Sequence, residues 1–347
     1  MTAEIASQRT TPASTMRHAL LGLYAQTSLH PGSGTALGLV DMPVQRERHT
    51  QWPSIPGSAI KGVIRDACRE KIAERSDLDA LERYDDKPGE PASRKGSKRQ
   101  RADATILLNA AFGPPTDGAS EFAGSVSFTD ARLLAFPVRS LSGVFAHVTC
   151  PAVLRRLKRD LEMARHPVDW SVPDVRGTQV VVPGSTCPCL IGGNTVVLEE
   201  YLLSRAENSC LDVANWVAEN TLPSAPAHEA TRAHFRSNFL VLSDDQFTHF
   251  VRFATEITAR IRLDYENKTV AAGALFYEEY LPPETLFYSI VLANGSRAKA
   301  AEKHGTDLSA ASVLRVVEDR LPPVIQLGAN QTTGKGFCFT RLTDLGG

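Results

Sequence analysis

The densest group of residues suited to phosphate chemistry lies in one glycine-rich stretch, residues 30–49. Asp41 is a candidate catalytic carboxylate, and His30 is a candidate to orient a group or move a proton beside it. Such a carboxylate can orient an attacking oxygen or bind a divalent cation during phosphodiester cleavage. Glycine permits positive φ and lets a ligand approach the backbone closely. The stretch contains three glycines, Gly32, Gly34 and Gly38.

Donors and positive charge follow the carboxylate within a few residues. Arginine, glutamine and histidine side chains suit phosphate and ribose oxygens. Mg²⁺ keeps several waters and takes substrate phosphates as ligands, so Asp41 alone can serve as the protein ligand of a Mg²⁺ or Mn²⁺ ion. An aspartate in a loop is also a common turn residue, which leaves a purely structural role open. The RNA-binding candidates here are Gln45, Arg46, Arg48 and His49.

A second group of candidate phosphate ligands opens a predicted helix after Pro56. Ser58 is the predicted N-cap, and a helix N-terminus is a natural anion site. Lys61 and Arg65 recur at four-residue spacing and so share one face of this helix. They predict either an RNA contact or an ordinary solvated surface.

A third group is the turn Gly334-Lys335-Gly336. It superficially resembles a Walker loop, but five residues separate Gly328 from Gly334, and a glycine replaces the Mg²⁺-binding Ser or Thr. These departures exclude nucleoside triphosphate binding by that motif. Exposed amides beside a strand, with Lys335, can still hold an RNA phosphate.

Glu278 and Tyr280 lie among aromatic and acidic residues just before a predicted strand. Such a segment can be packing followed by a turn. Alternatively, Glu278 supplies a second acid or an orienting group near the Asp41 stretch.

Short apolar strands alternating with amphipathic helices must position these groups. The order favours an α+β fold of the ferredoxin or RNA-recognition type. Predicted strands cover residues 19–25, 124–128, 132–136, 178–182, 195–198, 238–242, 285–293, 324–327 and 337–341. Predicted helices begin near residues 58, 151, 244 and 309. The third of these carries an apolar stripe that ends on Ile257 and Ile261.

The regions between these elements are less regular. Residues 1–16 are polar and predict a disordered tail before a single domain at 17–347. Residues 74–104 are acidic, then basic, with few apolar side chains, and predict an exposed, largely disordered insertion. Residues 221–234, rich in Pro, Ala and His, predict a loose segment.

Composition narrows the class of protein. A formal net charge of −1 means that any RNA contact must come from local patches. No apolar run is long enough to span a membrane. The six cysteines are scattered, and Cys187-Pro188-Cys189 has poor spacing for zinc. We therefore expect free thiols and a cytoplasmic location.

Several motifs, taken in this order, resemble the backbone subunit of type III-B CRISPR effector complexes, in the repeat-associated mysterious protein (RAMP) superfamily. The resemblance runs from about residue 20 to 342, with weak stretches at 75–105 and 200–235. The motifs are HPGSG with GLVDMPVQRERH, PSIPGSAIKG, SLSGVFAHVTCP, YEEYLP and TTGKGF.

The resemblance implies a modified RNA-recognition fold with an inserted thumb hairpin and a lid, which we place within 170–235. It implies copies stacked along a CRISPR guide RNA (crRNA), a paired single-stranded target RNA, and partners that include a large Cas10-type subunit and a small subunit. It also implies metal-dependent cleavage of the target.

The resemblance assigns roles to individual residues. The cleaving aspartate falls on Asp41 and the loop histidine on His30. Glu278 and Tyr280 fall beside that site. Phosphate contacts fall on Ser58 and Lys61, and on the turn from Gly334 to Gly336.

Two alternatives stay open. The chain can be a scaffold that binds guide RNA without cutting. It can also be a guide-processing ribonuclease that uses His30 or His49 without a metal.

Overall fold

The computed structural model describes residues 16–35, 40–74, 97–115, 122–261, 266, 275–297 and 308–346. Its strands are β1 Arg17–Ala25, β2 Ser54–Ile55, β3 Val126–Phe128, β4 Ala131–Arg139, β5 Phe145–Thr149, β6 Gln179–Val182, β7 Leu190–Ile191, β8 Thr195–Leu198, β9 Tyr201–Ser209, β10 Phe239–Leu242, β11 Glu256–Arg260, β12 Phe276–Tyr280, β13 Leu286–Ala293, β14 Val324–Gln326 and β15 Phe337–Gly346. The α-helices are α1 Gly57–Glu74, α2 Ser97–Phe112, α3 Pro151–Met163, α4 Leu211–Thr221, α5 Glu229–Asn238, α6 Asp244–Phe253 and α7 Ala310–Arg320. Short 3₁₀ turns lie at Pro226–His228 and Gln331–Thr333.

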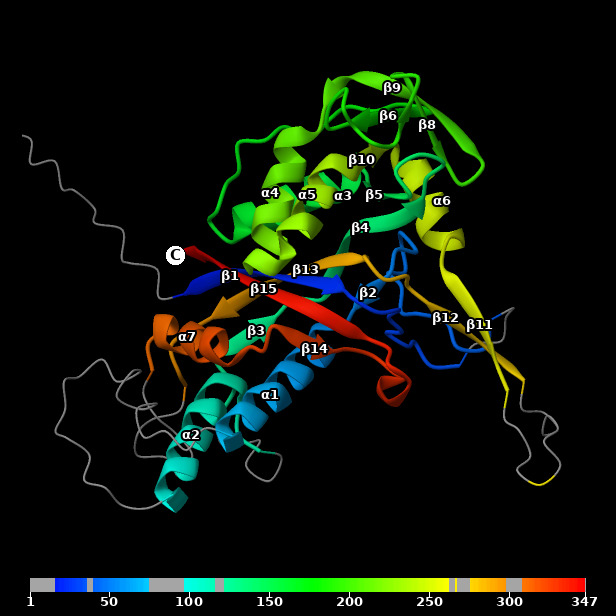
Figure 1. Cartoon of the computed structure of the whole chain (residues 1–347). Helices are drawn as coiled ribbons and strands as arrows, with labels where there is room; N and C mark the ends of the chain where they lie inside the picture. Colours follow the sequence, from blue (N-terminus) through cyan, green and yellow to red (C-terminus); the bar gives the residue numbers. More distant parts are fainter. Residues whose placement is uncertain are drawn as a thin grey trace, which may run out of the picture.

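One mixed sheet organises most of the chain. Its main path is β14-β15-β1-β13-β4-β5-β10-β6-β9-β8-β7, with β2 beside β4 and β3 beside β13. Strands β11 and β12 form a separate antiparallel pair that projects from the body (Figure 1). The alternation of strands and helices confirms the predicted α+β class.

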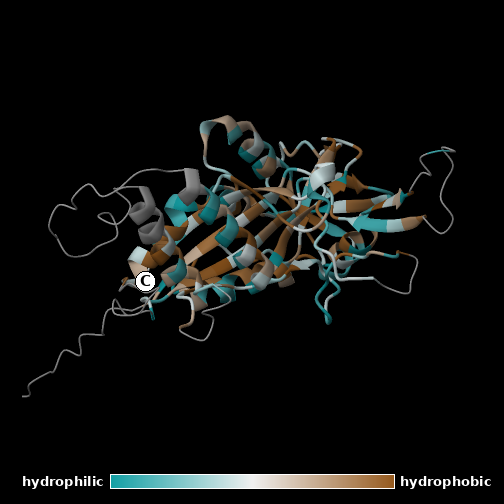
Figure 2. Cartoon of the chain, turned by 90° about the horizontal axis from the view of Figure 1, so that it is seen from below, coloured by the Kyte–Doolittle hydropathy of each residue, from teal (hydrophilic) through white to brown (hydrophobic). Residues whose placement is uncertain are grey.

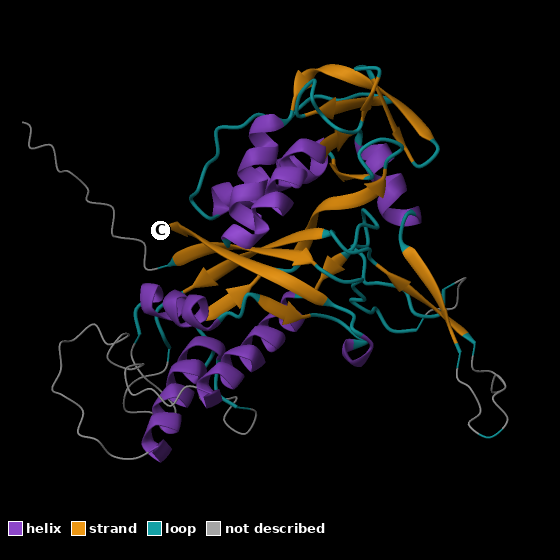
Figure 3. Cartoon of the chain, viewed as in Figure 1, coloured by secondary structure: helices purple, strands orange, loops and turns teal. Residues whose placement is uncertain are grey.

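Strand β1 lies at the centre of the fold because it pairs with β13 on one side and β15 on the other. Its side chains after Arg17 are buried on both faces. Helices α1, α2 and α7 cover one face and α4 packs on the other (Figure 3). At Gly22 an added Cβ would lie 2.1 Å from the carbonyl oxygen of Thr221, so the close approach of α4 requires glycine.

Helix starts follow local sequence signals. The Ser243 hydroxyl accepts a hydrogen bond from the Gln246 backbone N–H, as the predicted cap of α6 requires. Pro151 occupies the first turn of α3, whose leucines face the core. Figure 2 shows apolar residues gathered on the strands between the helical layers.

The predicted extent of the helix at 244–261 is wrong beyond Phe253. Residues from Glu256 onward form β11, in which Ile257 pairs with Glu279 of β12. Ile257 is 58% exposed, so it does not belong to a buried helical stripe. β-Branched residues such as Ile257 and Thr258 favour a strand once a partner strand is available.

Three other expectations change. The segment predicted to be loose is partly helical, because α5 begins at Glu229. Helix α2 begins at Ser97, within the last part of the predicted charged insertion; residues 75–96 lie outside the described residues, as do residues 1–15 of the predicted tail. Helix α1 begins at Gly57, whose N–H donates to the Asp130 carboxylate at 2.8 Å. Asp130, and not Ser58, therefore caps this helix.

The range 170–235, where we expected a thumb and lid, forms strands β6 to β9 and helices α4 and α5. Strands β6, β8 and β9 belong to the main sheet. The β11–β12 hairpin lies outside that range, and the tip that joins its strands falls mostly outside the described residues.

Two expectations from composition agree with the structure. None of the six cysteines forms a disulfide bond, and all six are buried. Within the part of the chain that the structure describes, no helix is long and apolar enough to cross a membrane.

His147 of β5 predicts a pH-dependent stability. It is fully buried, and within the described part of the chain neither ring nitrogen has a partner at hydrogen-bond distance; the nearest carboxylate, Glu284, lies 3.8 Å from Nε2. Burial, aided by nearby His234, lowers its pKa from 6.5 to about 3. Below pH 6.5 the unfolded chain therefore takes up a proton that the folded chain refuses until about pH 3, so folding weakens as pH falls.

We expect His147→Phe to remove about 2 kcal/mol of the stability that the protein loses between pH 7 and pH 5. Denaturant unfolding at both pH values measures this difference. The control is His49→Phe, whose ring is exposed in the native protein. An unchanged pH dependence in His147→Phe would contradict the prediction.

Candidate active site

The long loop that carries Asp41 and His30 is hydrogen-bonded along one edge of β12. The backbone of Leu281, which directly follows β12, exchanges two hydrogen bonds with Leu29. The backbone of Met42 bonds to Tyr277 and Glu279. Side chains complete the same edge, because Asp41 accepts from the Tyr277 N–H and His30 bonds to the Glu279 carbonyl. Residues far apart in sequence are thereby aligned along one strand.

The Asp41 carboxylate is exposed and fixed at one oxygen. Its Oδ2 accepts the hydrogen bond from the Tyr277 N–H at 2.7 Å. Within the described residues Oδ1 has no hydrogen bond, and it faces no cation in an ion pair. One oxygen of Asp41 therefore has a structural role in holding the loop, and the other remains available to a ligand.

His30 is buried, with 1% of its surface exposed. Its Nδ1 lies 2.6 Å from the Glu279 carbonyl oxygen, which requires Nδ1 to donate. The other nitrogen, Nε2, would lie 2.9 Å from a Cβ at Gly32. Glycine at that position keeps a side chain away from Nε2.

Glu279 is a site residue that sequence analysis missed. Its carboxylate accepts from the Val44 N–H at 3.0 Å and from Arg46 at 2.5 Å. Arg46 also donates to the carbonyl oxygens of Gln51 and Val251. Glu279 and Arg46 therefore hold the segment directly after Asp41, and Arg46 is committed to internal contacts.

Glu278 and Tyr280 lie on the other face of β12 in a closed network. The Tyr280 hydroxyl donates to Glu278 at 2.7 Å, Arg260 of β11 donates to both residues, and Asn330 donates to both from the C-terminal turn. Burial disfavours the Glu278 carboxylate, but hydrogen bonds from Tyr280, Asn330 and Arg260 outweigh it and lower its pKa. Burial and the neighbouring Glu278 raise the pKa of Tyr280. Through these hydrogen bonds the two side chains brace β12 against β11 and the turn that carries Asn330.

The Gly334–Gly336 turn packs against the same network. Lys335 donates to the Ser28 hydroxyl at 3.2 Å and lies 4.9 Å from the centre of the Tyr280 ring. The Gly336 N–H donates to the Ser28 carbonyl. Gly334 adopts positive φ, with open space where a Cβ would be. The turn thus supports the loop through Lys335 and Gly336, and the space beside Gly334 is unoccupied by neighbouring described residues.

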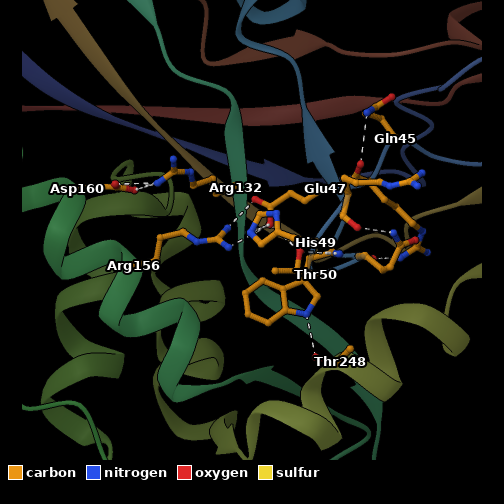
Figure 4. Close-up of polar contacts among 12 residues, drawn as sticks. Gln45, Glu47, His49, Thr50, Arg132, Arg156, Asp160 and Thr248 are labelled. Carbon is orange, nitrogen blue, oxygen red and sulfur yellow. Dashed lines mark hydrogen bonds and ion pairs between the residues drawn. The ribbon is translucent and has the colours of Figure 1, made fainter.

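The part of the loop that follows Arg46 is anchored to helix α3. Arg156 of α3 donates two hydrogen bonds to the Glu47 carboxylate, at 2.6 and 3.0 Å (Figure 4). Burial opposes ionisation of Glu47, but the bonds from Arg156 and Thr50 outweigh it and lower its pKa. Gln45 is partly buried, whereas Arg48 and His49 are exposed and face solvent.

The candidate cations of α1 have internal partners. Lys61 donates to the Val126 carbonyl at 3.0 Å, and Arg65 donates to the carbonyls of Gly113 and Pro114. Burial, with a smaller effect of Arg65, lowers the pKa of Lys61. Ser58 is exposed in the first turn. Lys61 and Arg65, which were predicted to share one face of α1, therefore attach this helix to β3 and to the segment that follows α2.

The donor set limits how a divalent ion can bind. Among the residues that the structure describes, no group of three or more His, Cys, Asp or Glu side chains is placed to hold a metal. Asp41 offers one carboxylate oxygen at the surface. This fits a Mg²⁺ ion whose other ligands are water and RNA phosphate, which is a usual arrangement for Mg²⁺.

Comparisons with known proteins agree with this architecture. A sequence model of the RAMP superfamily matches residues 23–339. The chain is 37% identical to the CRISPR system Cmr endoribonuclease Cmr4 of Pyrococcus furiosus over 95% of this chain and 97% of the relative. It is 26% identical to the CMR subunit Cmr4 of Saccharolobus solfataricus, over 91% of this chain and 94% of that one.

Solved structures give the same result. A crystal structure of oligomeric Cmr4 from P. furiosus superimposes with a TM-score of 0.64 at 28% identity, covering 95% of this chain and 98% of that chain. A subunit of the type III-B Cmr-beta complex bound to cognate target RNA has the same fold, with a TM-score of 0.64 at 20% identity, covering 94% of this chain and 96% of that one. The chain therefore belongs to the RAMP superfamily, within its family of type III-B CRISPR backbone subunits.

Proposed function

We propose that this chain binds crRNA within a type III-B complex and cleaves the complementary target RNA. The observation that carries the proposal is the exposed Asp41 carboxylate, fixed on β12 beside the buried His30. The curated relative with 37% identity is named an endoribonuclease, which supports RNA cleavage by this chain.

The proposed chemistry is attack of an RNA 2′-hydroxyl on the adjacent phosphorus. The new O2′–P bond forms as the P–O5′ bond breaks, which leaves a 2′,3′-cyclic phosphate. The 2′-hydroxyl proton leaves to a nearby base or water, and the departing 5′-oxygen takes a proton from water. The Asp41 carboxylate orients the attacking hydroxyl, and Glu279 keeps the following segment in register. A Mg²⁺ ion bound at Asp41 would neutralise charge on the phosphate. His30 is buried and bonds through Nδ1 to the Glu279 carbonyl, so its proposed role is to position the loop that carries Asp41.

RNA would reach this site across an exposed surface beside the loop. Arg48 and His49 are its exposed donors, and Gly334 marks the nearby open turn. We assign the thumb to the β11–β12 hairpin, which projects beside the loop and carries exposed Ile257 and Tyr277. Its apolar side chains suit contact with unstacked bases.

The proposed assembly follows the relatives. One solved relative is described as oligomeric and another as part of a complex bound to cognate target RNA. We propose that copies of this chain stack along crRNA, together with a large Cas10-type subunit and a small subunit, in the cytoplasm.

The proposed function predicts metal-dependent cuts in a complementary RNA. The complex reconstituted with crRNA should cleave end-labelled complementary RNA in Mg²⁺ or Mn²⁺, and a chelator should reduce the rate at least about 100-fold. A non-complementary RNA is the control. Cleavage that survives the chelator would favour metal-free chemistry at His30 or His49, and guide binding without any cleavage would favour a scaffold.

A further inference from the structure

An open cavity of about 490 Å³ lies away from the candidate active site, between the segment that follows α3 and one side of α4 from Asp212 to Glu219. Its lining combines two indole rings with three carboxylates. These residues are Trp170, Trp216, Asp169, Asp212 and Glu219. None of them takes part in the network around β12, so the RNA site leaves this cavity unexplained.

The indoles form a fixed aromatic wall. Their ring centres are 6.0 Å apart and the planes are tilted by 54°. Lys158 lies 5.2 Å from the centre of the Trp170 ring and donates to the Trp170 carbonyl, which fixes this ring and places a cation over it. Trp216 is only half-buried, so part of its ring remains open to a ligand.

Trp170 also carries an unused hydrogen-bond donor. The residue is 7% exposed, and its buried indole Nε1 has no hydrogen-bond acceptor among the described residues. A buried N–H without an acceptor weakens folding. Trp170 therefore forms the closed part of the aromatic wall, and Trp216 is the ring that a ligand can reach.

The carboxylates determine the charge of the ligand. Asp169, Asp212 and Glu219 are exposed and form no ion pair within the described part of the chain. Three unpaired negative charges repel a nucleic-acid phosphate and attract a cation. A guanidinium fits best, because it stacks on an indole and donates in its plane to several carboxylate oxygens.

We propose that this cavity binds an arginine side chain presented by a segment of a partner protein. The guanidinium lies against the open part of the Trp216 ring and pairs with Asp212 and Glu219. The site is separate from RNA cleavage and provides a protein contact on another surface of the subunit.

Indole N–H signals in an NMR titration test the proposal directly, because the chain has three tryptophans and two of them line the cavity. The probe is N-acetyl-L-arginine amide, and its neutral isostere N-acetyl-L-citrulline amide is the matched ligand control. We expect the arginine probe to shift the signals of Trp170 and Trp216 saturably and to leave Trp52 unchanged.

Variants separate this site from general charge attraction. Asp212→Asn with Glu219→Gln should weaken the arginine probe about three- to tenfold. Glu70→Gln, an exposed change on α1, should leave the affinity unchanged. Equal shifts with the citrulline probe, unchanged affinity in the double variant, or no saturation up to about 50 mM would overturn the proposal.

Discussion

Asp41→Asn is expected to lower target-RNA cleavage by the assembled complex at least about 100-fold while guide binding and folding stay intact. The asparagine oxygen can still accept the hydrogen bond from the Tyr277 N–H that the Asp41 carboxylate accepts at 2.7 Å. The substitution therefore keeps the loop on β12 and removes only the negative charge. Single-turnover cleavage of labelled complementary RNA, beside an electrophoretic assay of assembled complex, measures both effects.

The matched control is Asp66→Asn, which changes an exposed aspartate of α1 that pairs with Arg69. Its cleavage rate should equal that of the native chain. An Asp41→Asn complex that cuts at the native rate would remove this carboxylate from the mechanism. Loss of assembly in the same variant would instead show that Asp41 acts mainly in holding the loop.

Asp41 and His30 could be proposed from the sequence because they lie close together along the chain. Asp41 and His30 share one glycine-rich loop, and the resemblance assigned their roles. The predicted strands and caps also follow local rules, as Ser243 at the start of α6 illustrates. These features depend on neighbouring residues, so a pattern along the chain is enough to predict them.

The rest of the site depends on contacts between distant residues. The segment Phe276–Tyr280 does not alternate apolar and polar residues, so its periodicity does not indicate a strand, although β12 organises the whole loop. Asp130 caps α1 from 73 positions away, and Lys61 is bound by the carbonyl of Val126. Helix α2 had a local signal, the Ala- and Leu-rich run at 102–112, which its charged flank obscured.

Successive side chains of β12 point to opposite faces of the strand, and the two faces do different things. The resemblance pointed to the residues of one face and missed Glu279 on the other. Glu278 and Tyr280 point to the face shared with Arg260 and Asn330, where they brace the hairpin. Glu279, one residue away, bonds to the Asp41 loop on the other side. Because the hairpin and the loop share this strand, a movement of the projecting hairpin would be transmitted directly to Asp41.

Glu279→Gln is the second large prediction, because it breaks the ion pair that holds the loop. The Glu279 and Arg46 side chains are 8% and 15% exposed, so removing one charge leaves the other largely buried without its partner. The amide also has one acceptor oxygen for two donors, the Val44 N–H and Arg46. We expect the free energy of unfolding to fall by about 3 kcal/mol.

Cleavage should fall as well, by roughly tenfold or more per assembled complex, because a loop that shifts by about 1 Å misplaces the carboxylate. The rate is measured at a temperature where the variant remains folded, with saturating target, so that loss of turnover is separated from loss of binding. Glu207→Gln on β9 is the control, since that exposed carboxylate forms no ion pair within the described residues. Native stability and turnover in Glu279→Gln would show that β12 holds the loop by its backbone alone.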